Sequence, residues 1–302
     1  MMHGSRPALR RAASALAGRR PLSLRGATVL VTGGASGIGR LIALGAARRG
    51  ADRVVVWDLD LQGAEAVAAE IRSQGADAQA ERVDVTDAAA VEAAAARAGE
   101  VDVAVNNAGV VTGARLEDAT EEGIRRTFEV NALAPYWLTR AVLPGMRARD
   151  RGAVVTVASA AGLVGVARQT DYSATKHAAV GFAESLAAEL RKDGSRVTSL
   201  AVCPFYIDTG MFAGVRSRVP WLLPVLDPHH VAQEVLDAVE AGRTRLLMPR
   251  AVGLISGRAS AAQHDVVSVA TARWSNVRFD IREAPVQGPT AVARILTHLA
   301  DL

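Results

Sequence analysis

Short apolar runs alternate with segments of helical character along most of the chain. The first run, Ala27-Thr-Val-Leu-Val-Thr-Gly33, is rich in β-branched residues and leads into glycines, as expected of a buried strand. Further strands are expected at 53–57, 79–83, 101–105, 152–157, 197–202 and, at the edge of the sheet, 244–248. Helices are expected at 40–50, 61–73, 86–98, 120–149, 172–190 and 228–241.

This alternation with short connections predicts an α/β fold, a doubly wound parallel sheet in a single domain with helices on both faces. Residues 26–250 are expected to form the domain, and a chain of 302 residues is ample to bury its core. Ligands bind such sheets outside the carboxyl ends of the strands. Side chains at those ends are therefore the first candidates for function.

Composition excludes several classes of protein. Hydrophobic residues make up 50% of the chain and charged residues 22%, as in a globular protein, and no apolar run is long enough to span a bilayer. The net charge of +4 is modest, and no nucleic-acid partner is expected. The single cysteine, Cys203, rules out an internal disulfide, and no cluster of His, Cys and Asp has the spacing of a metal site.

The two ends of the chain differ from the domain between them. The leader at 1–25 is rich in arginine and contains no acidic residue. It is expected to be a disordered tail, with an organelle transit peptide or a weak contact to an anionic surface as alternatives. The protein is accordingly expected in the cytoplasm, or in mitochondria if the leader is a transit peptide. Residues 251–302 form an extension of unpredicted role, with helical spacing only at 290–301.

Two features near the first strands indicate a dinucleotide. Gly33-Gly-Ala-Ser-Gly37-Ile-Gly39 lies between a strand and a helix, where backbone N–H groups can bind a phosphate. Its spacing differs from the Gly-x-Gly-x-x-Gly fingerprint, and a purely structural turn is the alternative. Asp58 ends the next strand, where a carboxylate can bind the adenosine ribose and repel a 2′-phosphate, so NAD is favoured over NADP. The alternative for Asp58 is a cap of the helix that starts near Leu61.

A hydroxyl, a phenol and an ammonium follow the strand at 152–157. Ser159 ends that strand, and Tyr172 has Lys176 four residues after it, on the same face if the segment is helical. A phenol with an ordinary pKa of about 10 is a poor base at neutral pH, but a neighbouring cation lowers that pKa. Such a pair could take a proton from an alcohol while a hydride leaves its carbon. The alternative is an ordinary solvated face.

Further polar or small residues occupy the remaining strand ends, at 84–85, 106–109 and 204–209. Asn131 lies in the long helical stretch among apolar neighbours, so its amide must find a partner in a backbone network or in a site. Each of these segments has a plain structural interpretation as a turn or a cap. Because these segments all lie at the carboxyl ends of strands or in the turns that follow, a single cleft is favoured.

In this order the motifs resemble the short-chain dehydrogenase/reductase family. They are Thr32-Gly-Gly-Ala-Ser-Gly-Ile-Gly39, Asp84-Val85, Asn106-Asn-Ala-Gly109, Asn131, Ser159 and Tyr172-x-x-x-Lys176, and the resemblance spans about 27–250. It implies a Rossmann fold and an NAD(P)-dependent oxidoreductase acting on CH–OH groups.

The same resemblance implies roles for individual residues. Tyr172 would be the acid/base, and Ser159 would polarise the substrate oxygen. Lys176 would lower the tyrosine pKa and hold the nicotinamide ribose, while Asn131 would support a water-linked proton relay. Asp84 and Val85 would contact the adenine, and the Ile207 backbone and Thr209 hydroxyl the carboxamide. The implied cofactor contacts are Gly33, Ser36, Gly37, Ile38, Gly39, Asp58, Asp84, Val85, Asn107, Ala108, Gly109, Tyr172, Lys176, Pro204, Ile207 and Thr209.

One departure from the family pattern concerns the substrate side. Phe205 stands where the family usually has glycine after Pro204, and this variant is most similar to the branch acting on retinoids, steroids and other lipid alcohols. The region at about 205–227 corresponds to the family's substrate lid and is apolar here, although packing or an oligomer contact would also explain that. Its apolar members are Met211, Phe212, Val215, Trp221, Leu222, Leu223, Pro224 and Val225.

The predicted function is therefore an NAD-dependent oxidoreductase that interconverts an apolar alcohol and its aldehyde or ketone. Two alternatives are a non-catalytic NAD-binding or scaffold protein on the same fold and an NADPH-dependent carbonyl reductase. The expected partners are a small apolar substrate and further copies of the chain, in a homodimer or homotetramer.

Overall fold

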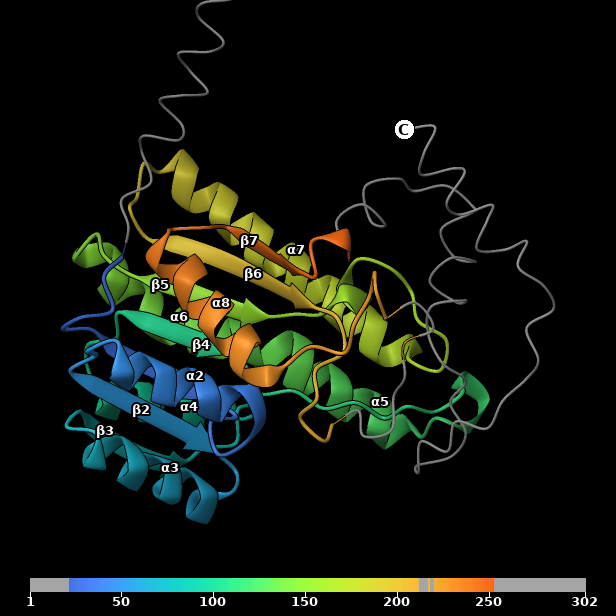
Figure 1. The fold of residues 1–302 in the computed structure, drawn as a ribbon, viewed down its shortest axis with the longest axis horizontal. Coiled ribbons are helices and arrows are strands. Elements are labelled where there is room, and N and C mark those ends of the chain that lie inside the picture. Colours follow the sequence, from blue (N-terminus) through green and yellow to red (C-terminus); the bar gives the residue numbers. More distant parts are fainter. Residues whose placement is uncertain (1–21, 212–216, 218–219, 253–302) are drawn as a thin grey trace, which may run out of the picture.

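A computed structural model describes residues 22–211, 217 and 220–252. Its centre is a seven-stranded parallel sheet in the order β3-β2-β1-β4-β5-β6-β7 (Figure 1). The strands are β1 (Thr28–Thr32), β2 (Arg53–Asp58), β3 (Asp77–Arg82), β4 (Val103–Asn106), β5 (Ala153–Val157), β6 (Thr198–Pro204) and β7 (Arg245–Met248). The prediction of a single α/β domain built on a doubly wound parallel sheet is confirmed.

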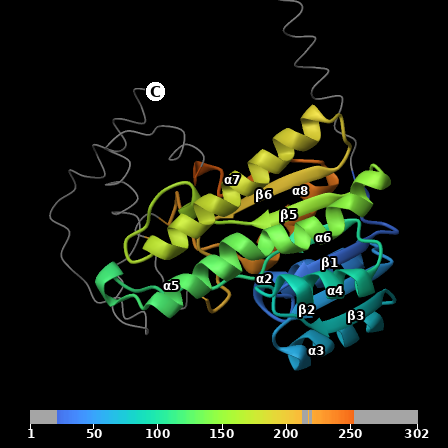
Figure 2. The same ribbon diagram turned by 180° about the vertical axis from the view of Figure 1, so that it is seen from behind.

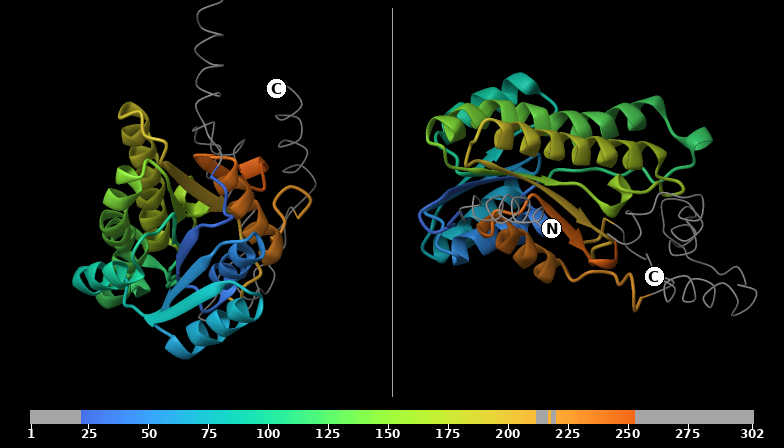
Figure 3. Two further views of the ribbon diagram at one scale, coloured as in Figure 1. Left: turned by 90° about the vertical axis from the view of Figure 1, so that its left-hand side faces the viewer. Right: turned by 90° about the horizontal axis from the view of Figure 1, so that it is seen from above.

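Helices cover both faces of the sheet. One layer contains α2, α3 and α8, and the other contains α4, α6 and α7, as Figures 2 and 3 show from behind and from the side. The helices are α2 (Gly37–Arg48), α3 (Leu61–Ser73), α4 (Ala88–Ala98), α5 (Glu121–Phe128), α6 (Ala134–Ala148), α7 (Thr170–Lys192) and α8 (Pro228–Glu240). Short 3₁₀ turns lie at Leu116–Asp118 and Ala160–Gly162.

Alternation along the central strands divides the core between these layers. In β1, Val29 and Val31 join the cluster under α2, α3 and α8, whereas Leu30 joins the cluster under α4, α6 and α7. All three side chains are fully buried. A strand buried on both faces is expected to be continuously apolar, which is the pattern that identified β1 in the sequence.

The helix expected at 120–149 is interrupted. A π-helical segment, η2 (Glu129–Leu133), separates α5 from α6 and carries Asn131. Pro135, near the start of α6, has no N–H to donate to the Asn131 carbonyl four residues earlier, so a regular α-helix cannot pass through this point unchanged. Helical periodicity continues on both sides, which is why the sequence pattern predicts one helix. π-helical turns inside α-helices are frequently found at functional sites.

The packed part of the chain extends beyond the boundaries expected at 26 and 250. Leu22 and Leu24 belong to the main core cluster, and Leu24 is fully buried. At the other end, Val252 packs against Ala160 and Leu223. The leader residues 1–21, Phe212, Val215 and the extension from 253 lie outside the described residues.

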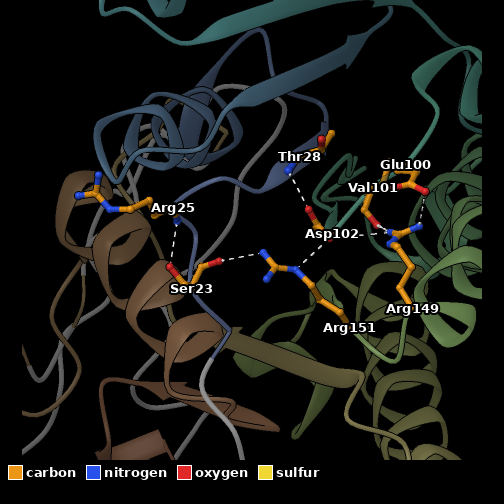
Figure 4. A network of polar contacts seen from close by, with 8 residues as sticks. All are labelled: Ser23, Arg25, Thr28, Glu100, Val101, Asp102, Arg149 and Arg151. Atoms are coloured by element: carbon orange, nitrogen blue, oxygen red, sulfur yellow. Dashed lines mark hydrogen bonds and ion pairs between the residues drawn. The ribbon is translucent and has the colours of Figure 1, made fainter.

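A polar network holds the start of the domain at the amino ends of β1 and β4 (Figure 4). The Asp102 carboxylate accepts hydrogen bonds from the Thr28 N–H at 3.1 Å and from Arg151 Nε at 3.2 Å. Arg151 Nη2 also donates to the Ser23 carbonyl at 3.5 Å. Ser23 is thus attached to the amino end of the sheet, opposite the carboxyl end where ligands are expected.

Two kinds of feature are absent from the part of the chain that the structure describes. No helix there has the length and apolar character needed to cross a bilayer. Nor do these residues bring together three or more His, Cys, Asp or Glu side chains in an arrangement that could hold a metal ion.

Candidate active site

A cavity of about 650 Å³ opens at the carboxyl ends of the strands. It brings together most of the residues predicted from the sequence, namely Gly33, Ser36, Gly37, Ile38, Asp58, Val85, Asn107, Ala108, Gly109, Ser159, Tyr172, Lys176, Pro204, Ile207 and Thr209. Gly39, Asp84 and Asn131 do not line it. One cleft therefore accounts for the convergence of motifs.

The glycine turn requires glycine at particular places. Gly33 and Gly37 have φ angles of 62° and 54°, in the region that side chains rarely adopt. A Cβ on Gly39 would lie 2.2 Å from the Gly33 carbonyl oxygen and 2.4 Å from Asn107 Nδ2. Gly39 therefore lets the first turn of α2 pack directly on the loop that leaves β1.

Asn107 joins this turn to the neighbouring strand. Its Nδ2 donates to the carbonyls of Thr32 and Gly33 at 2.9 and 3.0 Å, and its N–H donates to Thr32 Oγ1 at 3.0 Å. The turn is thus fixed with the α2 N-terminus at the cavity, and the first turn of α2 contains no acidic residue. A fixed helix N-terminus of this kind fits a pyrophosphate.

The Asp58 carboxylate faces this turn. Its Oδ2 accepts a hydrogen bond from the Ala35 N–H at 3.0 Å, and its Oδ1 accepts one from the Asp60 N–H at 3.0 Å. The cap of α3 is Asp60, whose side chain accepts from the Gly63 N–H, so the interpretation of Asp58 as that cap is excluded. Asp58 instead lines the cavity, where a carboxylate with free lone pairs suits ribose hydroxyls.

An arginine that the sequence motifs do not include lies at the same end of the cavity. Arg126 of α5 lines it, lies 3.7 Å from Asp84 Oδ2 and donates to Thr86 Oγ1 at 3.3 Å. Burial opposes ionisation of Asp84, but the Thr86 hydrogen bonds and the Arg126 charge together lower its pKa. Asp84 therefore holds Arg126 and the following loop, while its neighbour Val85 faces the cavity.

Ser159, Tyr172 and Lys176 form the other end of the site. Ser159 follows β5, and its hydroxyl accepts a hydrogen bond from the Ala161 N–H at 3.1 Å and is hydrogen-bonded to the Tyr172 phenol. Lys176 Nζ lies 5.5 Å from the centre of the Tyr172 ring and donates to the Val157 carbonyl at 2.9 Å. Tyr172 and Lys176 are 5% and 4% exposed, so their charged forms are strongly disfavoured.

Burial changes the acid–base picture expected from the sequence. It raises the pKa of Tyr172 to about 12, against the opposite effect of the Ser159 hydrogen bond. It also lowers the pKa of Lys176 to about 8, although the nearby Cys203 acts in the other direction. The Lys176 ammonium alone therefore does not lower the pKa of the Tyr172 phenol to near neutral pH. A further positive charge in the cleft is needed to favour the phenolate.

The Asn131 side chain makes three structural hydrogen bonds. Its Oδ1 accepts from the Val110 N–H at 2.9 Å, and its Nδ2 donates to the Val110 carbonyl at 2.8 Å and to Thr175 Oγ1 at 3.2 Å. The amide thus fastens the loop after β4 to η2 and α7. Pro135 leaves the backbone carbonyl of Asn131 without its usual helical donor.

The substrate end of the cavity is apolar. Phe205 and Met211 line it, and Phe205 packs against the cluster formed by Ala160, Leu223 and Val252. The two ends of the expected lid are joined, since the Leu226 N–H donates to the Tyr206 carbonyl at 2.8 Å. Not all of the region is packed: Trp221 is 64% exposed, which distinguishes it from an ordinary core residue.

The fold and the site define an oxidoreductase that uses a dinucleotide, because a glycine turn and the Asp58 carboxylate share one cleft with a serine, a tyrosine and a lysine. Comparison with known proteins identifies the family. The model for short chain dehydrogenases matches residues 27–220, and the chain belongs to that family.

Named relatives agree with this assignment. Epidermal retinol dehydrogenase 2 of Mus musculus is 38% identical over 239 residues, which are 76% of this chain and 75% of that protein. The 17-beta-hydroxysteroid dehydrogenase 13 of Mus musculus is 36% identical over 241 residues, 78% of each chain. The crystal structure of a short chain dehydrogenase/reductase from Burkholderia phymatum, in complex with NAD, superposes with a TM-score of 0.72 at 26% identity, covering 84% of this chain and 99% of that one. The resemblance to the retinol and hydroxysteroid branch is confirmed.

Proposed function

We propose that the protein is an NAD-dependent dehydrogenase that interconverts an apolar alcohol, of retinoid, steroid or lipid-like character, and its aldehyde or ketone. The observation that carries this proposal is the cavity itself, which contains Ser159, Tyr172 and Lys176 together with the Asp58 carboxylate. The names of the relatives support an alcohol substrate, and the apolar residues at the substrate end support an apolar one.

The residues present fit NAD at each part of the molecule. The N-terminus of α2 would bind the pyrophosphate, Asp58 the adenosine ribose and Val85 the adenine. The segment Asn107–Gly109 would line the dinucleotide, and Ile207 and Thr209 would hold the carboxamide. Lys176 would hold the nicotinamide ribose. When bound, NAD supplies the carbon that accepts the hydride and a positive charge near the phenol.

The chain's own groups handle the proton. The Ser159 hydroxyl would orient the alcohol oxygen by a hydrogen bond, and the Tyr172 Oη would take its proton. With a pKa of about 12, the phenol holds its proton at neutral pH in the protein alone. Alcohol oxidation is therefore expected to become faster as the pH rises, and carbonyl reduction, in which Tyr172 gives the proton, to become slower.

Replacement of Tyr172 by Phe tests the proposal. Tyr172→Phe should abolish turnover and leave the dissociation constant for NADH, measured by fluorescence titration, within about twofold, because only the proton-transfer group is lost. Tyr136→Phe is the matched control, since Tyr136 is 43% exposed and its ring contacts the Phe182 ring outside the cavity. Retained turnover in Tyr172→Phe would remove the proposed acid/base.

A substrate screen tests the remaining part. NADH formation should be measured with retinol, a hydroxysteroid, a long-chain fatty alcohol and a small polar alcohol, and turnover is expected with the apolar members. Tight NADH binding without turnover on any of them would favour the non-catalytic NAD-binding alternative. Faster turnover with NADPH and a carbonyl compound would favour the carbonyl reductase.

We also propose that the chain forms a homodimer or homotetramer and works in the cytoplasm. Exposed apolar side chains on the α5–α6 face, Phe128, Leu133 and Tyr136, support the first point. Light scattering after gel filtration would measure the mass, and a monomer at micromolar concentration would contradict it. Imaging of the tagged full chain would test the location, with mitochondria as the alternative.

A further inference from the structure

The helix that carries Tyr172 begins without a side-chain cap. The residue at the N-cap position of α7 is Gln169, and its side chain makes no capping hydrogen bond. Tyr172 lies in the first turn of α7, where backbone N–H groups have no partner within the helix. First turns without a cap fray, so other contacts must hold the phenol in place.

One such contact comes from the loop after β4. Asp171, the residue before Tyr172, is 6% exposed, and its Oδ2 accepts a hydrogen bond from Thr112 Oγ1 at 2.7 Å. A carboxylate in the first turn of a helix is also favoured by the helix dipole. The Thr112 hydroxyl therefore satisfies a buried acidic group directly beside the proposed acid/base.

Three successive residues of this loop are each fastened to the catalytic region. Val110 is held through both its N–H and its carbonyl by the Asn131 side chain. Val111 packs in the cluster that contains Tyr172. Thr112 is bonded to Asp171. Because Val110 and Val111 also line the cavity, displacement of the loop would move the cavity wall relative to the phenol.

We propose that the Thr112–Asp171 hydrogen bond is a positioning element for Tyr172, tying the first turn of α7 to the loop after β4 and holding the phenol toward Ser159. Neither residue lines the cavity, so the pair acts through Tyr172 and touches neither substrate nor cofactor. This inference rests on the proposed role of Tyr172 as the acid/base.

The test compares two substitutions of Thr112 in the full chain. Thr112→Val keeps the shape and removes the hydroxyl, and Thr112→Ser keeps the hydroxyl and removes the methyl group. Thr112→Val should lower kcat about tenfold, since small misplacements of a reacting group slow the chemical step strongly. The KM for NAD and the dissociation constant for NADH should stay within about twofold. Thr112→Ser should retain most of the wild-type kcat.

Two further readouts separate positioning from a general loss of stability. The primary deuterium isotope effect on kcat, measured with the best alcohol of the screen, should increase in Thr112→Val because hydride transfer becomes more rate-limiting. Thr120→Val is the matched control: Thr120 caps α5 by accepting from the Gly123 N–H at 3.0 Å, so its loss should lower Tm and leave kcat unchanged.

The outcomes are distinguishable. Wild-type kcat in Thr112→Val, an equal loss in Thr112→Ser, or an equal loss in Thr120→Val would overturn the positioning role. If Tyr172→Phe is inactive in the same assay, such a result removes the positioning role and leaves the proposed function intact. If Tyr172→Phe retains turnover, both the acid/base assignment and the positioning role fall.

Discussion

Gly39 offers the sharpest test of how the cofactor end of the cleft is built. In Gly39→Ala the new methyl group would lie 2.2 Å from the Gly33 carbonyl oxygen and 2.4 Å from Asn107 Nδ2. The first atom is backbone and cannot swing aside. The second is held by two hydrogen bonds to backbone carbonyls. The helix α2 must therefore move away from the glycine turn.

The expected cost follows from this geometry. Overpacking of a well-packed site costs about 1–3 kcal/mol, and for a domain of this size each kcal/mol lowers Tm by about 2–4 °C. Displacement of the α2 N-terminus also removes N–H groups from the place where they would meet the pyrophosphate, so NADH should bind at least about tenfold more weakly. Thermal unfolding and fluorescence titration measure the two effects separately.

Gly181→Ala is the matched control. Gly181 lies in the middle of α7, and a Cβ there would meet nothing within 4 Å. The substitution should raise stability by up to about 1 kcal/mol, because alanine favours a helix over glycine, and it should leave NADH binding unchanged. Wild-type Tm and wild-type affinity in Gly39→Ala would refute the packing argument.

Three other predictions follow from the structure. Asp58→Ala should reduce the ratio of kcat/KM for NAD to that for NADP, because the ribose partner and the repulsion of a 2′-phosphate are both lost; an unchanged ratio would remove this assignment. Lys176 has a pKa of about 8 when folded and 10.5 ordinarily, so the unfolded chain binds more protons between these values and the free energy of unfolding should rise over this range. Burial raises the pKa values of Cys203 and Tyr172 to about 12, so above pH 9.0, the ordinary pKa of Cys203, these groups act in the opposite direction. Urea unfolding should therefore show the rise between about pH 8 and 9 in the wild type, and Lys176→Met should lack it. Deletion of residues 1–25 should cost at least about 2–5 kcal/mol more than deletion of residues 1–21, since Leu24 is fully buried; equal Tm values of the two truncated chains would show that this core contact is dispensable.

Much of the fold could be predicted from local pattern alone. Buried parallel strands are apolar runs bounded by turn residues, so β1 and its neighbours could be placed within a few residues, and strand ends indicated where a cleft should form. Leu24 shows the limit at the domain boundary, because its burial depends on packing against distant elements. The basic residues around Leu24 form no local pattern that indicates its burial.

The candidate site shows the same division. Residues with a distinctive spacing, such as Tyr172 and Lys176, could be found in the sequence and lie together in the cavity. Arg126 could not, because its position at the cavity depends on Asp84, which is distant in sequence. Nor does spacing reveal that the Asn131 amide is hydrogen-bonded to Val110 and Thr175. It also does not reveal that burial outweighs the Ser159 hydrogen bond in setting the pKa of Tyr172.

The π-helical segment between α5 and α6 has a consequence for the angular phase of these helices. Each residue of an α-helix advances by about 100° around the axis, so one extra residue in a turn rotates everything after it by that amount. The extra residue therefore changes the angle between the face of η2 that turns Asn131 toward Val110 and the face of α6 that buries Leu138 and Met146. In a regular α-helix, residues seven apart, such as Asn131 and Leu138, would lie on nearly the same face. The extra residue thus gives the part of the helix that faces the cleft and the part that faces the core different orientations.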